Sequence, residues 1–167
     1  MSYLRLVNQH LSSVRIILDE LDHRVETDAA LESAFHHSAL SLLNSAYLCQ
    51  LRAIAENYHC SDTPEINTIE SLQAALVAID KPAPEAREIE VLVSEGWLGE
   101  LLRAHQRLCL DETFQLPTIN TPRFVQSDIA LHDEDGEQSS LSAPKLRQWK
   151  HTLEELVQRQ SEMMTEY

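Results

Sequence analysis

The chain has 167 residues, of which 43% are hydrophobic and 24% are charged, and its formal net charge is −14. This composition is typical of one folded globular domain and not of a disordered chain. Because clustered Lys and Arg bind nucleic acids and anionic membranes, the negative charge argues against both as partners. Three cysteines without a Cys-x-x-Cys spacing are typical of buried free thiols in a reducing compartment, so we expect the cytoplasm.

The first predicted helix runs from about residue 3 to residue 25 and carries a single apolar seam. The members of the seam follow a 3-4-3-4 spacing: Leu4, Val7, Leu11, Val14, Leu18, Leu21 and Val25. A repeat near 3.5 residues favours lengthwise packing at a shallow angle. The seam either packs inside the chain or binds a partner helix, and burial of Leu11 and Leu18 in the monomer would exclude the partner.

The second predicted helix covers about residues 28–60 and carries two rows of apolar residues. Two apolar rows are typical of a central helix with neighbours on both sides. The sequence from Cys60 to Pro64 breaks this helix, and a short third helix follows over about 67–79. Pro82 and Pro84 end the third helix, because proline lacks an amide donor and disfavours helix in the residue before it.

A fourth helix is predicted over about residues 84–110. Gly96 and Gly99 lie inside it, where each glycine costs about 1 kcal/mol relative to alanine. We interpret the two glycines as a kink or a close approach between helices. The alternative is a backbone surface for a small apolar ligand in a groove beside Trp97.

Residues 111–142 contain two prolines and an acidic run, and they predict a long loop whose part at 132–140 is mobile. Ser142 begins the last helix, whose seam repeats the 3-4 spacing: Leu146, Trp149, Leu153, Leu156, Gln160 and Met163. The sequence therefore predicts one all-α domain over residues 1–167. The expected architecture is an up-and-down four-helix bundle with an additional short helix and a long loop before the C-terminal helix.

Two Glu-x-x-His pairs, Glu20 with His23 and Glu56 with His59, have the spacing that ferritin-like bundles use to hold a metal. The first pair falls on the outer face of its helix, opposite the apolar seam. The second pair lies at the end of a helix, beside the break. Because such a metal site needs inward-facing ligands from several helices, we expect surface residues and no metal or other cofactor.

His105 and Cys109 are one helical turn apart, which is a plausible spacing for two metal ligands. Two ligands do not complete a metal site. We therefore expect a buried thiol beside a hydrogen-bonded core histidine.

Arg52 and His59 are separated by six residues, and this spacing resembles the Arg-x(4–6)-His signature of HEPN nucleases, which are also helical bundles. In that family the arginine and the histidine act on an RNA phosphodiester, usually across a dimer. The sequence departs from the signature at Ala53, where the family normally has a polar residue. The net charge of −14 also fits RNA poorly, so the resemblance implies an alternative function only.

Two further stretches carry a Trp and Leu pattern: Glu95 to Arg103 (EGWLGELLR) and the ending from Trp149 to Met163. Together with the helix from Phe35 to Tyr58, they resemble a family of small uncharacterised bacterial proteins that is catalogued only as a domain of unknown function. The resemblance covers most of the chain. It implies an all-helical bundle of bacterial, cytoplasmic origin, and it implies no activity and no functional residues.

Neither a glycine-rich phosphate loop nor a nucleophile motif occurs in the sequence. We therefore expect a non-enzymatic protein-interaction or scaffold module that binds an unknown protein or a second copy of itself as a homodimer. The alternatives are an enzyme, either the HEPN-like ribonuclease or a metal-dependent bundle, and a binder of a small apolar ligand.

Overall fold

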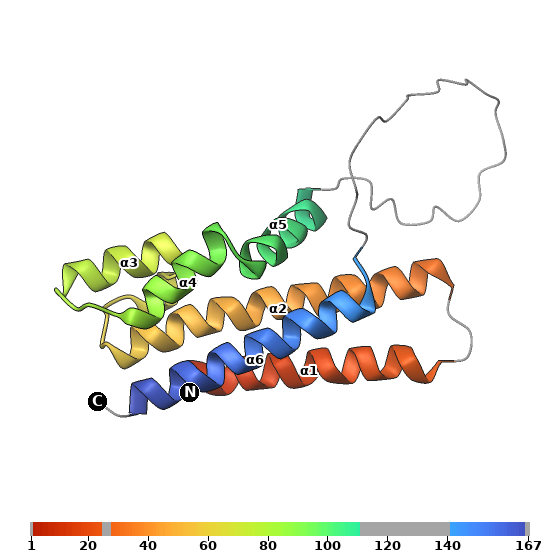
Figure 1. The fold of residues 1–167 in the computed structure, drawn as a ribbon, viewed down its shortest axis with the longest axis horizontal. Helices are drawn as coiled ribbons and strands as arrows, with labels where there is room; N and C mark the ends of the chain where they lie inside the picture. The colour runs from red at the N-terminus through yellow and green to blue at the C-terminus, as the bar shows by residue number, and fades with distance from the viewer. Residues whose placement is uncertain (1, 25–27, 111–140, 166–167) are drawn as a thin grey trace, which may run out of the picture.

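The computed structural model describes residues 2–24, 28–110 and 141–165. These residues form helices and turns without a strand, which confirms the all-α class. The helices are α1 (Tyr3–His23), α2 (Ala29–Asn57), the 3-10 turn η1 (Thr63–Glu65), α3 (Ile69–Ala78), α4 (Pro84–Ser94), α5 (Trp97–Leu110) and α6 (Ala143–Thr165) (Figure 1). The predicted loop over 111–142, with its mobile part, lies outside the described residues apart from its last two.

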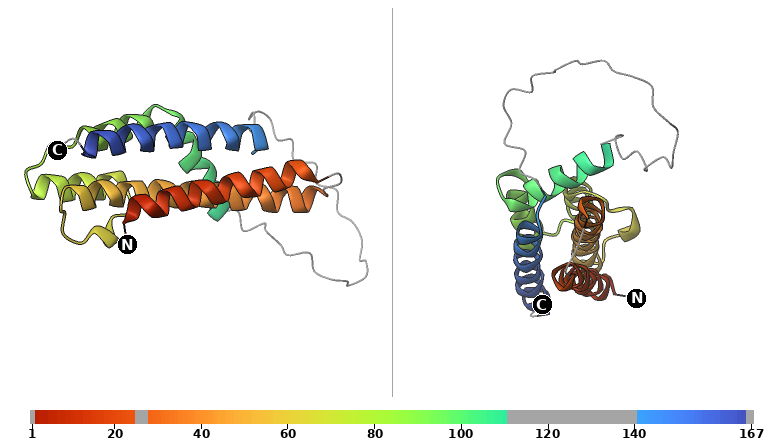
Figure 2. Two further views of the ribbon diagram at one scale, coloured as in Figure 1. Left: turned by 90° about the horizontal axis from the view of Figure 1, so that it is seen from below. Right: turned by 90° about the vertical axis from the view of Figure 1, so that its right-hand side faces the viewer.

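The long helix α2 is the centre of the fold, as its two apolar rows predict. It contacts α1, α3, α4, α5 and α6. Figure 1 shows α1 and α6 along one side of α2, with α3, α4 and α5 on the other side. The helix α1 runs antiparallel to α2, whereas α6 runs parallel to α2 (Figures 1 and 2). The first and last helices of the chain therefore lie side by side in opposite directions.

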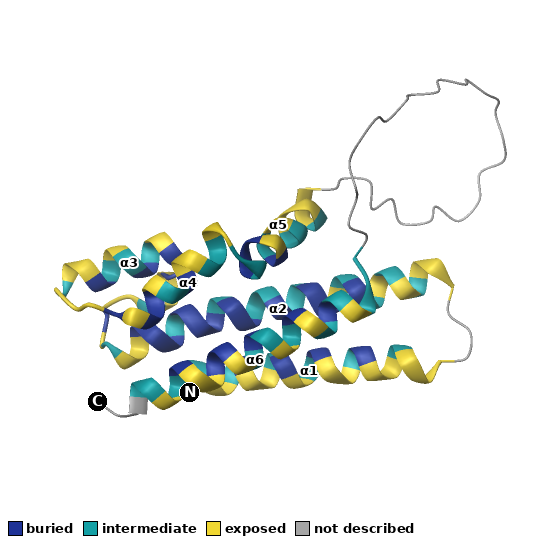
Figure 3. Cartoon of the chain, viewed as in Figure 1, coloured by how far each residue is buried: buried dark blue, intermediate teal, exposed yellow. Residues whose placement is uncertain are grey.

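The apolar seam of α1 is buried inside the chain, where α1 contacts α2 and α6 (Figure 3). Its four central residues have exposed fractions of 2% or less: Val7, Leu11, Val14 and Leu18. Leu4 and Leu21 are half-buried, and Val25 lies outside the described residues. Because Leu11 and Leu18 are buried in the monomer, the hypothesis that this seam binds a partner helix is wrong.

The prediction of a single fourth helix over about 84–110 is wrong, because α4 ends at Ser94 and α5 begins at Trp97. The two glycines explain the break. A Cβ on Gly96 would lie 2.9 Å from the backbone oxygen of Leu92, and a Cβ on Gly99 would lie 2.2 Å from that of Val93. Only glycine permits so close an approach between the start of α5 and the last turn of α4.

The described helices do not include a candidate for a bilayer span. None of them combines the length and the hydropathy that crossing a membrane requires.

Candidate functional site

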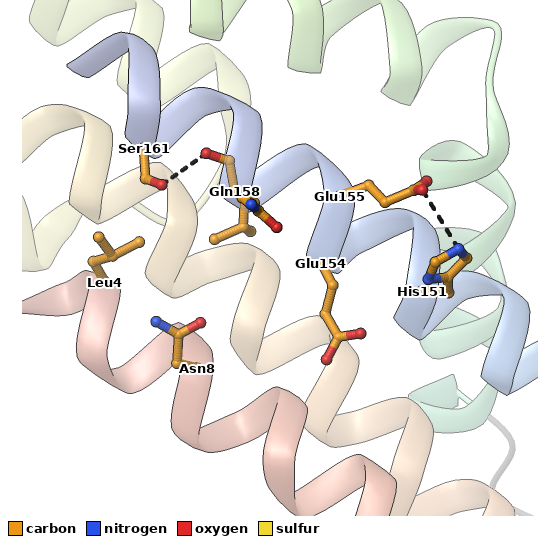
Figure 4. A pocket seen from close by; sticks show the side chains of 8 residues that line it. Leu4, Asn8, His151, Glu154, Glu155, Gln158 and Ser161 are labelled. Atoms are coloured by element: carbon orange, nitrogen blue, oxygen red, sulfur yellow. Dashed lines mark hydrogen bonds and ion pairs between the residues drawn. The ribbon is translucent and has the colours of Figure 1, made fainter. Parts of the chain in front are cut away.

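An open groove of about 490 Å³ lies between α1 and α6 (Figure 4). Two residues of α1 and six of α6 line it: Leu4, Asn8, His151, Glu154, Glu155, Val157, Gln158 and Ser161. Val157 is buried and Leu4 is half-buried, so these two side chains form the apolar part of the lining. Figure 4 shows Glu154 reaching from α6 towards α1. The groove thus combines a small apolar area with a polar, acidic border.

Glu155 is exposed and Glu154 is half-buried, and among the described residues the ion-pair partners of both carboxylates lie within α6. Lys150 Nζ lies 2.6 Å from Glu154 Oε1, and the Glu154 side chain remains 40% exposed. His151 Nε2 lies 3.4 Å from Glu155 Oε1, and this histidine is charged only when it is protonated. No Lys or Arg is among the residues that line the groove. Both carboxylates can therefore accept hydrogen bonds from a cationic group outside the chain.

The arginine of the nuclease-like motif, Arg52, makes hydrogen bonds within the fold. Arg52 Nε donates to the backbone oxygen of Ile66 at 3.0 Å, and Arg52 Nη2 donates to Asn67 Oδ1 at 2.7 Å. These bonds hold the turn before α3 against α2. His59 follows the end of α2 in an exposed position with a φ of 58°, which is the left-handed region. The described contacts of Arg52 are structural and do not bring it to His59.

The two Glu-x-x-His pairs also have local partners. Glu20 and His23 are exposed, as predicted, and His23 Nδ1 lies 2.6 Å from a backbone oxygen of its own helix. Glu56 Oε2 accepts a hydrogen bond of 3.2 Å from the backbone nitrogen of Tyr3, and so it joins the end of α2 to the start of α1. Among the described residues, no group of three or more His, Cys, Asp or Glu could hold a metal ion.

The expectation of a buried thiol at Cys109 is wrong, because Cys109 is exposed in the last turn of α5. Its Sγ lies 3.9 Å from each ring nitrogen of His105, and burial lowers the pKa of His105. Cys49 and Cys60 are buried and free, as predicted, and burial raises the pKa of both thiols.

The sequence patterns gave no indication of the groove residues Asn8, Gln158 and Ser161. They lie on the polar faces of two helices at opposite ends of the sequence, and a polar helix face alone does not indicate a site. The charge of the C-terminal helix gave no signal either, because it carries four Lys or Arg against three Glu.

Comparison with known families gives one result. The chain matches, over residues 1–167, a family described as Family of unknown function (DUF6586). This match confirms the resemblance to a domain of unknown function. Neither the curated proteins nor the solved structures contain a match to the chain.

Proposed function

The chain belongs to this family of unknown function, and from its geometry we propose a non-enzymatic interaction module that binds a basic, amphipathic helix of another protein. The observation that carries the proposal is the groove between α1 and α6. It replaces the buried α1 seam as the surface for a partner.

The shape of the groove supports a helical ligand. Amphipathic helices commonly bind by placing one apolar face in a groove between helices. Leu4, which is half-buried, can contact an apolar side chain of such a ligand. Asn8, Gln158 and Ser161 supply hydrogen-bonding groups at the border.

The charge of the groove supports a basic ligand. Glu154 and Glu155 lie on its border, and the chain as a whole has a net charge of −14. A field of this sign attracts cationic partners and raises the rate of their association. It also disfavours a second copy of the chain at the same surface, because like charges would be brought together.

A synthetic peptide with Leu and Lys in heptad spacing, labelled with fluorescein, tests the proposal by fluorescence anisotropy. We expect Glu154→Lys with Glu155→Lys to weaken binding about ten-fold or more, because two cation-binding groups are reversed. The matched control is Glu90→Lys with Glu95→Lys, which makes the same change of net charge at exposed positions of α4 and its C-cap. Equal weakening by both pairs would show attraction to the overall charge and would reject the groove.

A steric variant provides a test that does not depend on charge. We expect Asn8→Trp to fill the groove and to abolish peptide binding, whereas Gln9→Trp, at an exposed neighbouring position that does not line the groove, leaves binding unchanged. Unchanged affinity in the Asn8→Trp variant, with its circular dichroism preserved, would reject the groove as the binding surface.

A further inference from the structure

A buried pair of amides lies in the otherwise apolar interface between α2 and α6. The exposed fractions of Gln50 and Gln160 are 1% and 0%. Gln50 Nε2 donates a hydrogen bond of 2.9 Å to Gln160 Oε1. Burying an amide is unfavourable unless its hydrogen bonds are made, so this pair requires an explanation beyond apolar packing.

Two acceptors on α4 fix the direction in which the Gln160 amide points. Gln160 Nε2 donates to the backbone oxygen of Glu85 at 3.3 Å and to Glu88 Oε2 at 3.0 Å. Glu88 is itself held by an ion pair with Arg159. Because the amide nitrogen of Gln160 is directed to α4, its oxygen is left to accept from Gln50.

The apolar residues of α6 do not by themselves define its alignment along α2. Its seam repeats every seven residues, with Leu146, Leu153 and Gln160 in one column and Trp149, Leu156 and Met163 in the other. A displacement of α6 by one heptad, about 10 Å, would again place mostly apolar residues against α2.

The covalent connection does not choose the alignment either. Residues 111–142 separate the end of α5 from the start of α6. These 32 residues are enough to reach a start of α6 that is displaced by about 10 Å.

We infer that Gln50 and Gln160 set the register of α6 against α2. After a displacement of one heptad, Gln50 would face Leu153, or Gln160 would face Leu43, which lies seven residues before Gln50 on α2. Either alignment buries an amide without its partner, which is unfavourable. A single buried polar contact is known to specify helix register at some cost in stability. Gln50 Oε1 shows such a cost, because it is buried and finds no donor among the described residues.

The register matters for the surface of the molecule as well. It decides which residues of α6 meet Leu4 and Asn8 across the groove. The inference nevertheless stands apart from the proposed function, because its test contains no ligand.

Chemical cross-linking reports the register directly. Arg147 Nη2 lies 2.5 Å from Asp22 Oδ2, so Asp22→Cys with Arg147→Cys reports the native alignment. Asp22→Cys with Glu154→Cys reports the displacement by one heptad in which Gln160 would face Leu43. Both pairs are made in a Cys109→Ser background and are treated with a short bis-maleimide. With Gln50 and Gln160 intact, we expect cross-linking of the native pair only.

The decisive variant carries Gln50→Leu and Gln160→Leu, which leave the seam apolar throughout. We expect the displaced pair to cross-link at least five-fold more than in the parent, and backbone amide signals of α6 to double in NMR spectra. Exposed glutamines provide the control, since Gln9→Leu with Gln148→Leu should leave both readouts native. Native cross-linking with a single set of signals in the decisive variant would overturn the inference. Loss of folding would overturn it too, because a pair that only sets register is dispensable for stability.

Discussion

His36 is only 6% exposed, although histidine gains a charge in mildly acidic solution. Burial lowers the pKa of His36 from its usual value of 6.5, and the nearby carboxylate of Glu32 opposes this shift only in part. The folded chain therefore binds this proton less readily than the unfolded chain. The contribution of neutral His36 to stability is complete above about pH 6.5 and is lost as the pH falls below that value.

An NMR titration of the His36 ring protons is expected to give a midpoint below 6.5. The difference in melting temperature between pH 7.5 and pH 5.5 should also become smaller in a His36→Met variant. A midpoint at or above 6.5 would contradict the burial of this ring.

Gly99 is expected to be intolerant of a methyl group. In an ordinary helix Gly→Ala is favourable by about 1 kcal/mol. Here the added Cβ would lie 2.2 Å from the backbone oxygen of Val93, which cannot move independently of α4. We expect Gly99→Ala to lower the free energy of unfolding by about 2 kcal/mol, measured by denaturant titration with circular dichroism. An exposed site on the same helix, Gln106→Ala, should change it by less than about 0.5 kcal/mol. Unaltered stability in Gly99→Ala would show that α4 and α5 separate easily.

At the scale of the helices, the burial of the α1 seam is the simplest feature to test. Leu11 is 2% exposed, whereas Ile16 on the same helix is 63% exposed. Truncating a buried leucine removes its contacts and leaves a cavity, so Leu11→Ala should cost about 2–5 kcal/mol of unfolding free energy. Ile16→Ala should cost less than about 0.5 kcal/mol. Similar costs at both positions, in the same denaturant titration, would contradict the packing of α1 against α2 and α6.

The positions of most helices can be predicted well from the sequence, because apolar spacing and prolines are local signals. The second helix was expected over about 28–60 and is found at Ala29–Asn57. The close approach of backbones that Gly96 and Gly99 predict is found, but the complete break between α4 and α5 was not predicted, since the apolar rows continue across Gly96. That break depends on how closely two helix backbones approach, which spacing along one chain does not reveal.

For the whole molecule, the groove could not be predicted from local patterns. Leu4 and Ser161 meet in it because the first and last helices lie antiparallel, and that arrangement depends on the register of α6. Gln160 was visible in the sequence as a polar residue within an apolar seam. Its partner Gln50 was not visible, because the pair joins positions 110 residues apart.

The most direct test of the proposed function maps where the basic peptide binds. In amide NMR spectra of the labelled protein, titration with the Leu and Lys peptide is expected to shift the signals of Asn8, Gln158 and Ser161. The signals of Glu90 and Glu95, the exposed control positions of α4 and its C-cap, should stay in place. Shifts spread evenly over all acidic surfaces, or confined to sites away from α1 and α6, would contradict the proposal.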